Sequence, residues 1–133
     1  MSLLRLSILL VSGVLAASCV SVPTCPSGPV QFKNKSELTL KQSYTASEAA
    51  FYVAQKFGNC RCGIDSIEVQ QNLTQKSSDY KQSAAGHVVS GELTERWLAY
   101  GCGKAYPFDV KIVPDGKGGT DVYTSRVASK WPQ

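Results

Sequence analysis

The stretch LTERWLAYGCGKAYPFDVKIV, residues 93–113, predicts two neighbouring strands of an antiparallel sheet. A Gly-Cys-Gly segment at residues 101–103 separates its two extended halves. In the second half, apolar side chains recur at every second position, which is typical of a strand with one buried face. These side chains are Tyr106, Phe108, Val110 and Ile112, and the charged Asp109 and Lys111 alternate with them. Pro107 has no amide hydrogen, so we expect this strand at an edge of the sheet or bulged at Pro107.

The segments around this stretch extend the same sheet. Residues 67–73 alternate apolar and polar side chains and predict a half-buried strand. Residues 74–86 are polar and rich in turn formers, so we expect a loop there. An extended run over residues 87–90 continues into the first half of the stretch, with a bend at Gly91. Residues 115–119 read DGKGG and predict a hairpin turn, from which residues 120–127 return as a strand.

Residues 44–58 predict the helix of the domain. Thr45 and Glu48 match the T-x-x-E capping box that begins many helices, and Gly58 with Asn59 supplies a helix stop. Helical spacing predicts a buried face made of Ala46, Ala50, Val53, Ala54 and Phe57, and an opposite face made of Glu48, Tyr52 and Gln55. One helix packed on an antiparallel β-meander of about four strands gives an α+β fold of two layers.

The N-terminal residues have the pattern of an export signal. Arg5 supplies a positive charge, residues 6–17 are mostly apolar, and small residues precede Cys19. The apolar run is shorter than the roughly twenty residues that a transmembrane helix needs. Residues 16–19, AASC, resemble the lipobox of bacterial lipoproteins, which implies that residues 1–18 are removed and that Cys19 carries lipid. Val20 at the next position implies the periplasmic face of the outer membrane. Ordinary cleavage before Cys19, which would leave a soluble secreted protein, is the alternative.

Composition and charge bound the rest of the chain. Residues 19–36 hold Cys19 and a segment rich in Pro, Gly and Ser, which predicts a flexible tether. Removing the first 18 of the 133 residues leaves 115, which suits one domain, and we place it at residues 37–133. The net charge of +4 falls to +3 without Arg5, which is too small to indicate nucleic acid as a partner.

Four cysteines besides Cys19 predict two disulfides. An even number in an exported chain is typical of a disulfide framework, and four cysteines allow three connectivities. Cys60 and Cys62 lie between the helix and the first strand, and Cys102 lies between two later strands, so the meander brings them to one end of the sheet. We expect Cys102 to bridge one member of the doublet and Cys25 to fasten the tether through the other. A direct bond from Cys60 to Cys62 would close a strained ring.

Residues 47–113 resemble a family of small exported bacterial proteins and lipoproteins of unknown function. The shared pattern is an Ala-rich helix at residues 49–57, Cys62, an I-x-V strand at residues 67–69, and an aromatic strand ending in Gly-Cys-Gly at residues 97–103. The resemblance implies a structural Cys62–Cys102 disulfide, which leaves Cys25 to pair with Cys60. Members often carry a further cysteine after Gly-Cys-Gly, whereas this chain has none there and has the Cys60 doublet in addition. The family implies no established activity.

Residues with catalytic or metal-binding potential do not form a known motif. Cys60, Cys62, Cys102 and His87 could ligate zinc, but an oxidising envelope favours disulfides. A reactive thiol in the doublet would have Arg61 beside it, yet a helix C-terminus disfavours a thiolate. Ser90, His87 and Asp79 or Asp109 lack a nucleophile-elbow pattern. Glu92 and Glu95 fall on opposite faces of a strand, unlike a glycosidase pair. We expect no catalytic residue, cofactor or metal.

These observations predict a non-catalytic binding module. The expected partner is an envelope protein, such as a secretion or assembly machine, or a toxic hydrolase that the module neutralises. We expect the contact surface to include Trp131, exposed in the C-terminal tail, and Tyr52, on the polar face of the helix. The alternatives are a thiol–disulfide enzyme that uses Cys60 and Cys62, and a binder of the cell wall or of a small ligand.

Overall fold

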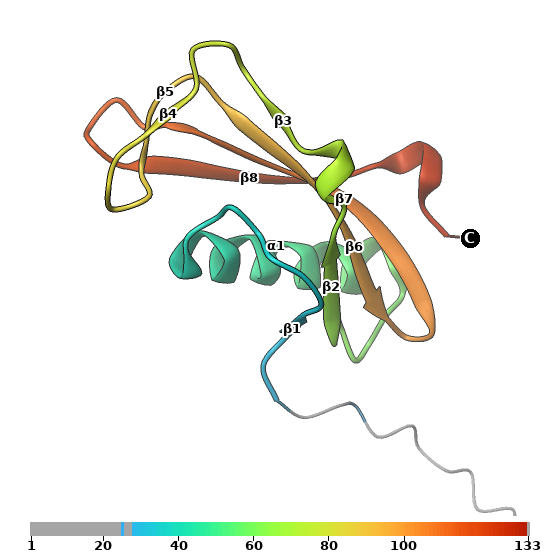
Figure 1. The fold of residues 1–133 in the computed structure, drawn as a ribbon. Coiled ribbons are helices and arrows are strands. Elements are labelled where there is room, and N and C mark those ends of the chain that lie inside the picture. Colours follow the sequence, from blue (N-terminus) through green and yellow to red (C-terminus); the bar gives the residue numbers. More distant parts are fainter. Residues whose placement is uncertain (1–24, 26–27, 133) are drawn as a thin grey trace, which may run out of the picture.

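The computed structural model describes Cys25 and residues 28–132. Within them one α-helix, α1 (Leu40–Gly58), lies across one face of a six-stranded sheet (Figure 1). The strands of this sheet are β1 (Gln31–Phe32), β2 (Ser66–Val69), β3 (Gln75–Lys76), β6 (Leu93–Gly101), β7 (Lys104–Pro114) and β8 (Thr120–Arg126). A separate two-stranded sheet contains β4 (Lys81–Gln82) and β5 (Val88–Ser90). Short 3-10 turns cover Gln71–Leu73 and Ala128–Lys130.

The strand order is β1-β2-β6-β7-β8, with β3 paired to the start of β6. β1 runs parallel to β2, and the other neighbours are antiparallel. The predicted α+β class is confirmed. The predicted meander of about four antiparallel strands is incomplete, because the sheet of the described residues is mixed and has six strands. The additional strands β1 and β3 come from residues that the sequence assigns to the tether and to the loop over residues 74–86.

The hairpin of β6 and β7 forms the centre of the sheet, and its two strands are antiparallel neighbours, as predicted. Its register runs from Leu93 opposite Ile112 to Gly101 opposite Lys104. Cys102 and Gly103 make the turn, and both have positive φ (53° and 69°), as the favoured two-residue hairpin turn requires. The predicted alternation along β7 is confirmed, since its buried residues include Tyr106, Phe108, Val110 and Ile112.

Pro107 lies inside the sheet and not on an edge strand, so the expected edge position of β7 is wrong. Its backbone faces β8, because the Pro107 carbonyl accepts a hydrogen bond from the Val127 amide at 2.9 Å. β8 ends at Arg126, opposite Phe108. The missing amide hydrogen therefore falls where the neighbouring strand has just ended, and it leaves Pro107 and Val127 joined by one hydrogen bond at the end of the ladder.

The helix begins five residues before the predicted capping box. Thr39 is the N-cap: its hydroxyl accepts the Gln42 amide hydrogen at 3.3 Å, and the Gln42 side chain accepts the Thr39 amide hydrogen at 2.9 Å. Thr45 lies within the helix, where its hydroxyl donates to the Lys41 carbonyl at 3.0 Å. The predicted stop is confirmed, because Asn59 is the C-cap with a left-handed φ of 51°.

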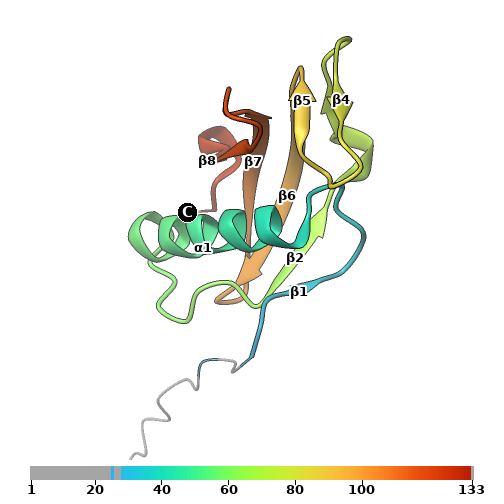
Figure 2. The ribbon, with the colours of Figure 1, turned by 90° about the vertical axis from the view of Figure 1, so that its left-hand side faces the viewer.

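Small residues let α1 approach the sheet closely (Figure 2). Ala46, Ala50 and Ala54 are fully buried, as predicted, against a core that includes Trp97 and Phe108. Phe57, predicted on the same face, is 51% exposed, and its ring lies 4.6 Å from the Arg126 guanidinium. The predicted outer face is confirmed, since it is formed by the exposed Glu48, Tyr52 and Gln55.

Candidate binding groove

Residues 28–38, which we call the arm, lie along the edge of the sheet before α1 begins. The Gln31 amide donates to the Asp65 carbonyl at 3.1 Å, and the Lys33 amide donates to the Ile67 carbonyl at 2.9 Å. The Asn34 carboxamide then bonds both the amide and the carbonyl of Val69. The tether expected over residues 19–36 therefore ends earlier, because its part from Gln31 onward belongs to the domain. Residues 19–24, 26 and 27 lie outside the described residues.

Two disulfides flank the C-terminal end of α1. Cys25 bonds Cys62, with Cα atoms 4.9 Å apart, and Cys60 bonds Cys102, with Cα atoms 5.6 Å apart. The prediction that these four cysteines form disulfides is confirmed. The predicted pairing of Cys62 with Cys102 and of Cys25 with Cys60 is wrong, although Cys25 does fasten the N-terminal segment to the domain.

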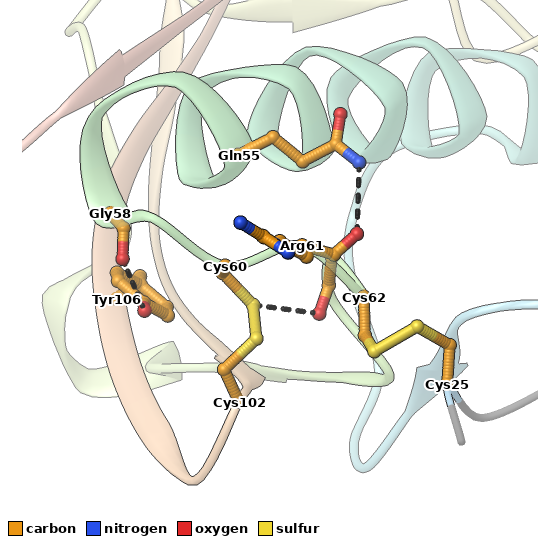
Figure 3. Close-up of a disulfide and its surroundings, with 9 residues drawn as sticks. Cys25, Gln55, Gly58, Cys60, Arg61, Cys62, Cys102 and Tyr106 are labelled. Atoms are coloured by element: carbon orange, nitrogen blue, oxygen red, sulfur yellow. Dashed lines mark hydrogen bonds between the residues drawn. A yellow bond between two sulfur atoms is a disulfide. The ribbon is translucent and has the colours of Figure 1, made fainter. Parts of the chain in front are cut away.

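The turn after α1 decides which cysteine takes which partner. The Gly63 amide donates to the Cys60 carbonyl at 3.2 Å, so the chain reverses between them. Cys60 is buried and reaches Cys102 at the β6–β7 turn, while Cys62 reaches Cys25, ahead of the arm (Figure 3). Gly63 has a φ of 69°, and any side chain there would collide with the ring of Phe51. This close packing of helix against turn fixes the orientation of both sulfur atoms.

A buried carboxylate holds the other end of the arm. Glu95 on β6 is 1% exposed and accepts three hydrogen bonds: from the Ser36 hydroxyl at 2.7 Å, the Glu37 amide at 2.7 Å and the Trp97 indole at 2.8 Å. A buried charge needs such donors to offset its desolvation. The alternation along β6 could have predicted that Glu95 is buried. Glu95 lies on the same face of the strand as the buried Leu93, Trp97 and Ala99.

The arm and α1 form the two walls of a groove of about 870 Å³. The helix wall carries Leu40, Tyr44, Ser47 and Phe51 on successive turns. The arm wall carries Pro29, Val30, Phe32 and Leu38. The arm runs back along the helix. Its last residue, Leu38, adjoins the start of α1. Cys25, ahead of the arm, forms a disulfide with Cys62, next to Gly63, which packs on the ring of Phe51. A volume of this size is within the range of small-molecule and cofactor sites.

Large apolar side chains of the groove face solvent. Leu40 is 87% exposed and Tyr44 is 65% exposed, and both Phe32 and Phe51 are partly exposed. Most of the groove surface is apolar, with Lys35 and Glu48 as its charged residues. A hydrogen bond to the Glu48 carboxylate raises the pKa of the Tyr44 phenol above its ordinary value. Exposed apolar clusters of this kind are typical of interaction surfaces.

The two predicted contact residues lie outside this groove. Trp131 packs on the core, with its ring 4.9 Å from that of Tyr106 and 5.1 Å from that of Phe108, so its expected exposure is wrong. Tyr52 is 59% exposed on α1, with the Lys56 ammonium 5.7 Å from its ring. The roles of Trp131 and Tyr52 in binding stay predictions. No local sequence pattern predicts the groove itself, since its walls meet only through tertiary structure.

Cys19, the predicted lipidation site, lies outside the described residues. Cys60, Cys62 and Cys102, considered with His87 as zinc ligands, are all disulfide-bonded. Among Cys25 and residues 28–132 there is no group of three His, Cys, Asp or Glu side chains arranged to hold a metal. In the same residues, no helix is both long and apolar enough to cross a membrane.

Compared with models of protein families, with curated proteins and with solved structures, the chain matches none of them. The resemblance to small exported lipoproteins and the lipidation of Cys19 therefore stay predictions from the sequence.

Proposed function

We propose that this protein is a non-catalytic binding module, lipid-anchored at Cys19 on the periplasmic face of the outer membrane, that holds an apolar segment of a partner protein of the envelope. The observation that carries the proposal is the groove between the arm and α1. Leu40 and Tyr44 are one turn apart on the helix, and both expose large apolar surfaces beside a hollow. Neither contributes to the buried core, so a partner is what would remove these side chains from water.

The groove is held open at both ends, which favours binding. The Cys25–Cys62 disulfide fastens the chain just ahead of the arm, and the hydrogen bonds of Glu95 with Ser36 and Glu37 fix the end of the arm. A wall that is already in place loses little conformational entropy when a partner docks. The proposed site is thus largely preformed.

The proposed anchor suits this arrangement. Five residues lie between Cys19 and Cys25, and the six fully extended steps from one to the other span at most about 22 Å. A lipid on Cys19 would therefore keep the groove near the membrane surface, where a partner in the same membrane is locally concentrated. The rival thiol–disulfide function would need Cys60 and Cys62 as a couple, whereas each of them is bonded to a different cysteine.

Site-specific photo-cross-linking in cells that export the protein tests the proposal. Benzoylphenylalanine in place of Tyr44 is expected to yield a defined covalent adduct, which Leu40→Ser in the same chain abolishes. Tyr123, 57% exposed on β8, is the matched control position, and Tyr52, the contact residue predicted from the sequence, tests the rival surface on the outer side of α1. An adduct from Tyr52 or Tyr123 with none from Tyr44, or no adduct from any of them, would overturn the groove as the working surface.

The anchor needs its own measurement. Labelled palmitate is expected to enter the wild-type protein, and Cys19→Ala is expected to lose the label and to accumulate with its leader uncut. Wild-type protein without label would refute lipidation while leaving the cross-linking result to stand.

A further inference from the structure

We infer that the occupant of the groove is an extended peptide strand that adds to the free edge of β1 and places alternate apolar side chains under α1. This inference rests on the proposed function and specifies the conformation and chemistry of the partner segment. It follows from the backbone of the arm, the length of the helix wall and the polar groups that any occupant would bury.

The backbone of the arm offers an unpaired edge. β1 has β2 on one side and, among the described residues, no strand on its other side. The amides of Gln31 and Lys33 both donate to the β2 side. Backbone groups alternate in direction along a strand, so the amide and carbonyl of Phe32 between them point to the open edge. An exposed edge of this kind is a template for strand addition.

The side chains of the arm show where an added strand would lie. The Phe32 ring packs edge-on against the buried Trp97 ring at 5.3 Å, so Phe32 faces the helix layer. Val30 and Phe32 line the groove from this face of the edge. A strand placed next to β1 would continue the sheet, and every second side chain of it would enter the groove.

The length of the helix wall matches a short strand. Leu40, Tyr44 and Phe51 lie on one side of α1, and eleven residues of helix rise about 16 Å. An extended chain covers about 16 Å in five residues, at about 3.3 Å each. Two or three of those five side chains would face inward, against Leu40, Tyr44 and Phe51. The helix wall thus has room for a pentapeptide core with apolar residues at alternate positions.

The buried polar groups distinguish a strand from other occupants. An acyl chain or an apolar helix seated in the groove would cover the Phe32 amide and carbonyl without bonding either of them, which costs free energy. A peptide strand pairs both groups and buries the same apolar surface. Lys35 and Glu48 both line the groove, so we expect the strand to be selected by its apolar pattern and not by net charge.

Selection from a random dodecapeptide library, displayed on phage, tests the inference on the purified residue 19–133 protein with its disulfides intact. We expect peptides with apolar residues at i, i+2 and i+4. They should lose binding to Tyr44→Ser and keep it to Tyr123→Ser, the matched control at a tyrosine that is 57% exposed on β8 and outside the groove. Peptides with apolar residues at i, i+3 and i+4, or no peptides that discriminate Tyr44→Ser from wild type, would overturn strand addition.

Backbone methylation of one selected peptide tests the hydrogen bonds directly. N-methylation of the residue that pairs with Phe32 should weaken binding about tenfold, and methylation of the next residue should have a small effect. The Phe32 amide should gain protection from hydrogen exchange in the complex. Methylation without effect at every position contradicts the inference. If a partner cross-links at Tyr44 in cells and binds through a helical segment, the proposed function stands and strand addition falls.

Discussion

At the scale of the residue, the hydrogen bonds of Glu95 hold the C-terminal end of the arm on the sheet. One carboxylate oxygen accepts from Ser36 and Trp97, and the other accepts from Glu37. A glutamine in this position has one oxygen and one amide group. Its amide would have to face either the Trp97 indole N–H or the Glu37 amide N–H, and neither of them can accept a hydrogen bond.

We therefore expect Glu95→Gln to lower the free energy of unfolding by about 1–3 kcal/mol, the usual cost of a buried unsatisfied group. Urea unfolding measures this loss, and faster amide exchange at Glu37 would place it in the arm. The control is Glu92→Gln, which removes only the exposed ion pair with Lys111 at 2.7 Å and should cost at most about 1 kcal/mol. Equal losses in the two variants would contradict the buried role of Glu95.

Asp115 controls the acid stability of the β7–β8 turn. Hydrogen bonds from the backbone amides of Lys117 and Gly119 lower the pKa of its carboxyl below the ordinary 3.8. The carboxylate therefore stabilises the fold above the ordinary pKa, and this contribution is lost as the pH falls through the lowered value. We expect wild type to melt at a higher temperature than Asp115→Asn at neutral pH, and the difference to shrink as the pH falls below the ordinary pKa of 3.8. Thermal melts across this range measure it, and a difference that persists in acid would count against the assignment.

At the scale of the element, the turn after α1 sets the disulfide pairing, and this pairing is directly measurable. Trypsin cuts after Arg61 and so separates Cys60 from Cys62. Without reduction, we expect fragment 57–61 joined to fragment 97–104, and fragment 62–76 joined to the fragment that ends at Lys33. Mass spectrometry identifies both pairs. Fragment 62–76 joined to fragment 97–104 would show the other connectivity, in which Cys25 is fastened through Cys60 and not through Cys62.

The elements also show how far local sequence carries. The alternation of Tyr106, Phe108, Val110 and Ile112 predicts β7 because one face of that strand is wholly buried. The helix start could not be chosen in the same way, since Thr39 with Gln42 and Thr45 with Glu48 both match a capping box. A contact decides between them: Glu95, distant in sequence, holds the arm just ahead of Thr39.

At the scale of the whole molecule, the features missed from the sequence are those made by distant pairing. β1 has two residues and no periodicity, and its partner β2 follows more than thirty residues later. The spacing of Cys60 and Cys62 predicts that both lie near one end of the sheet, but it does not predict the direction in which each side chain points. The groove depends on both of these, because the Cys25–Cys62 bond and β1 together hold its arm wall. Its apolar walls therefore come together only in the folded chain.

The Cys25–Cys62 bond also sets the route by which mechanical force enters the domain. Tension on the chain ahead of Cys25 passes through the covalent bridge into the turn after α1, bypassing β1, whose short ladder would otherwise be peeled away one hydrogen bond at a time. A peptide strand bound at the free edge of β1 would thereby be shielded from tension on the N-terminal side. Reduction of this one disulfide would transfer the tension to β1, so the affinity for the bound peptide strand would fall when the N-terminal segment is pulled.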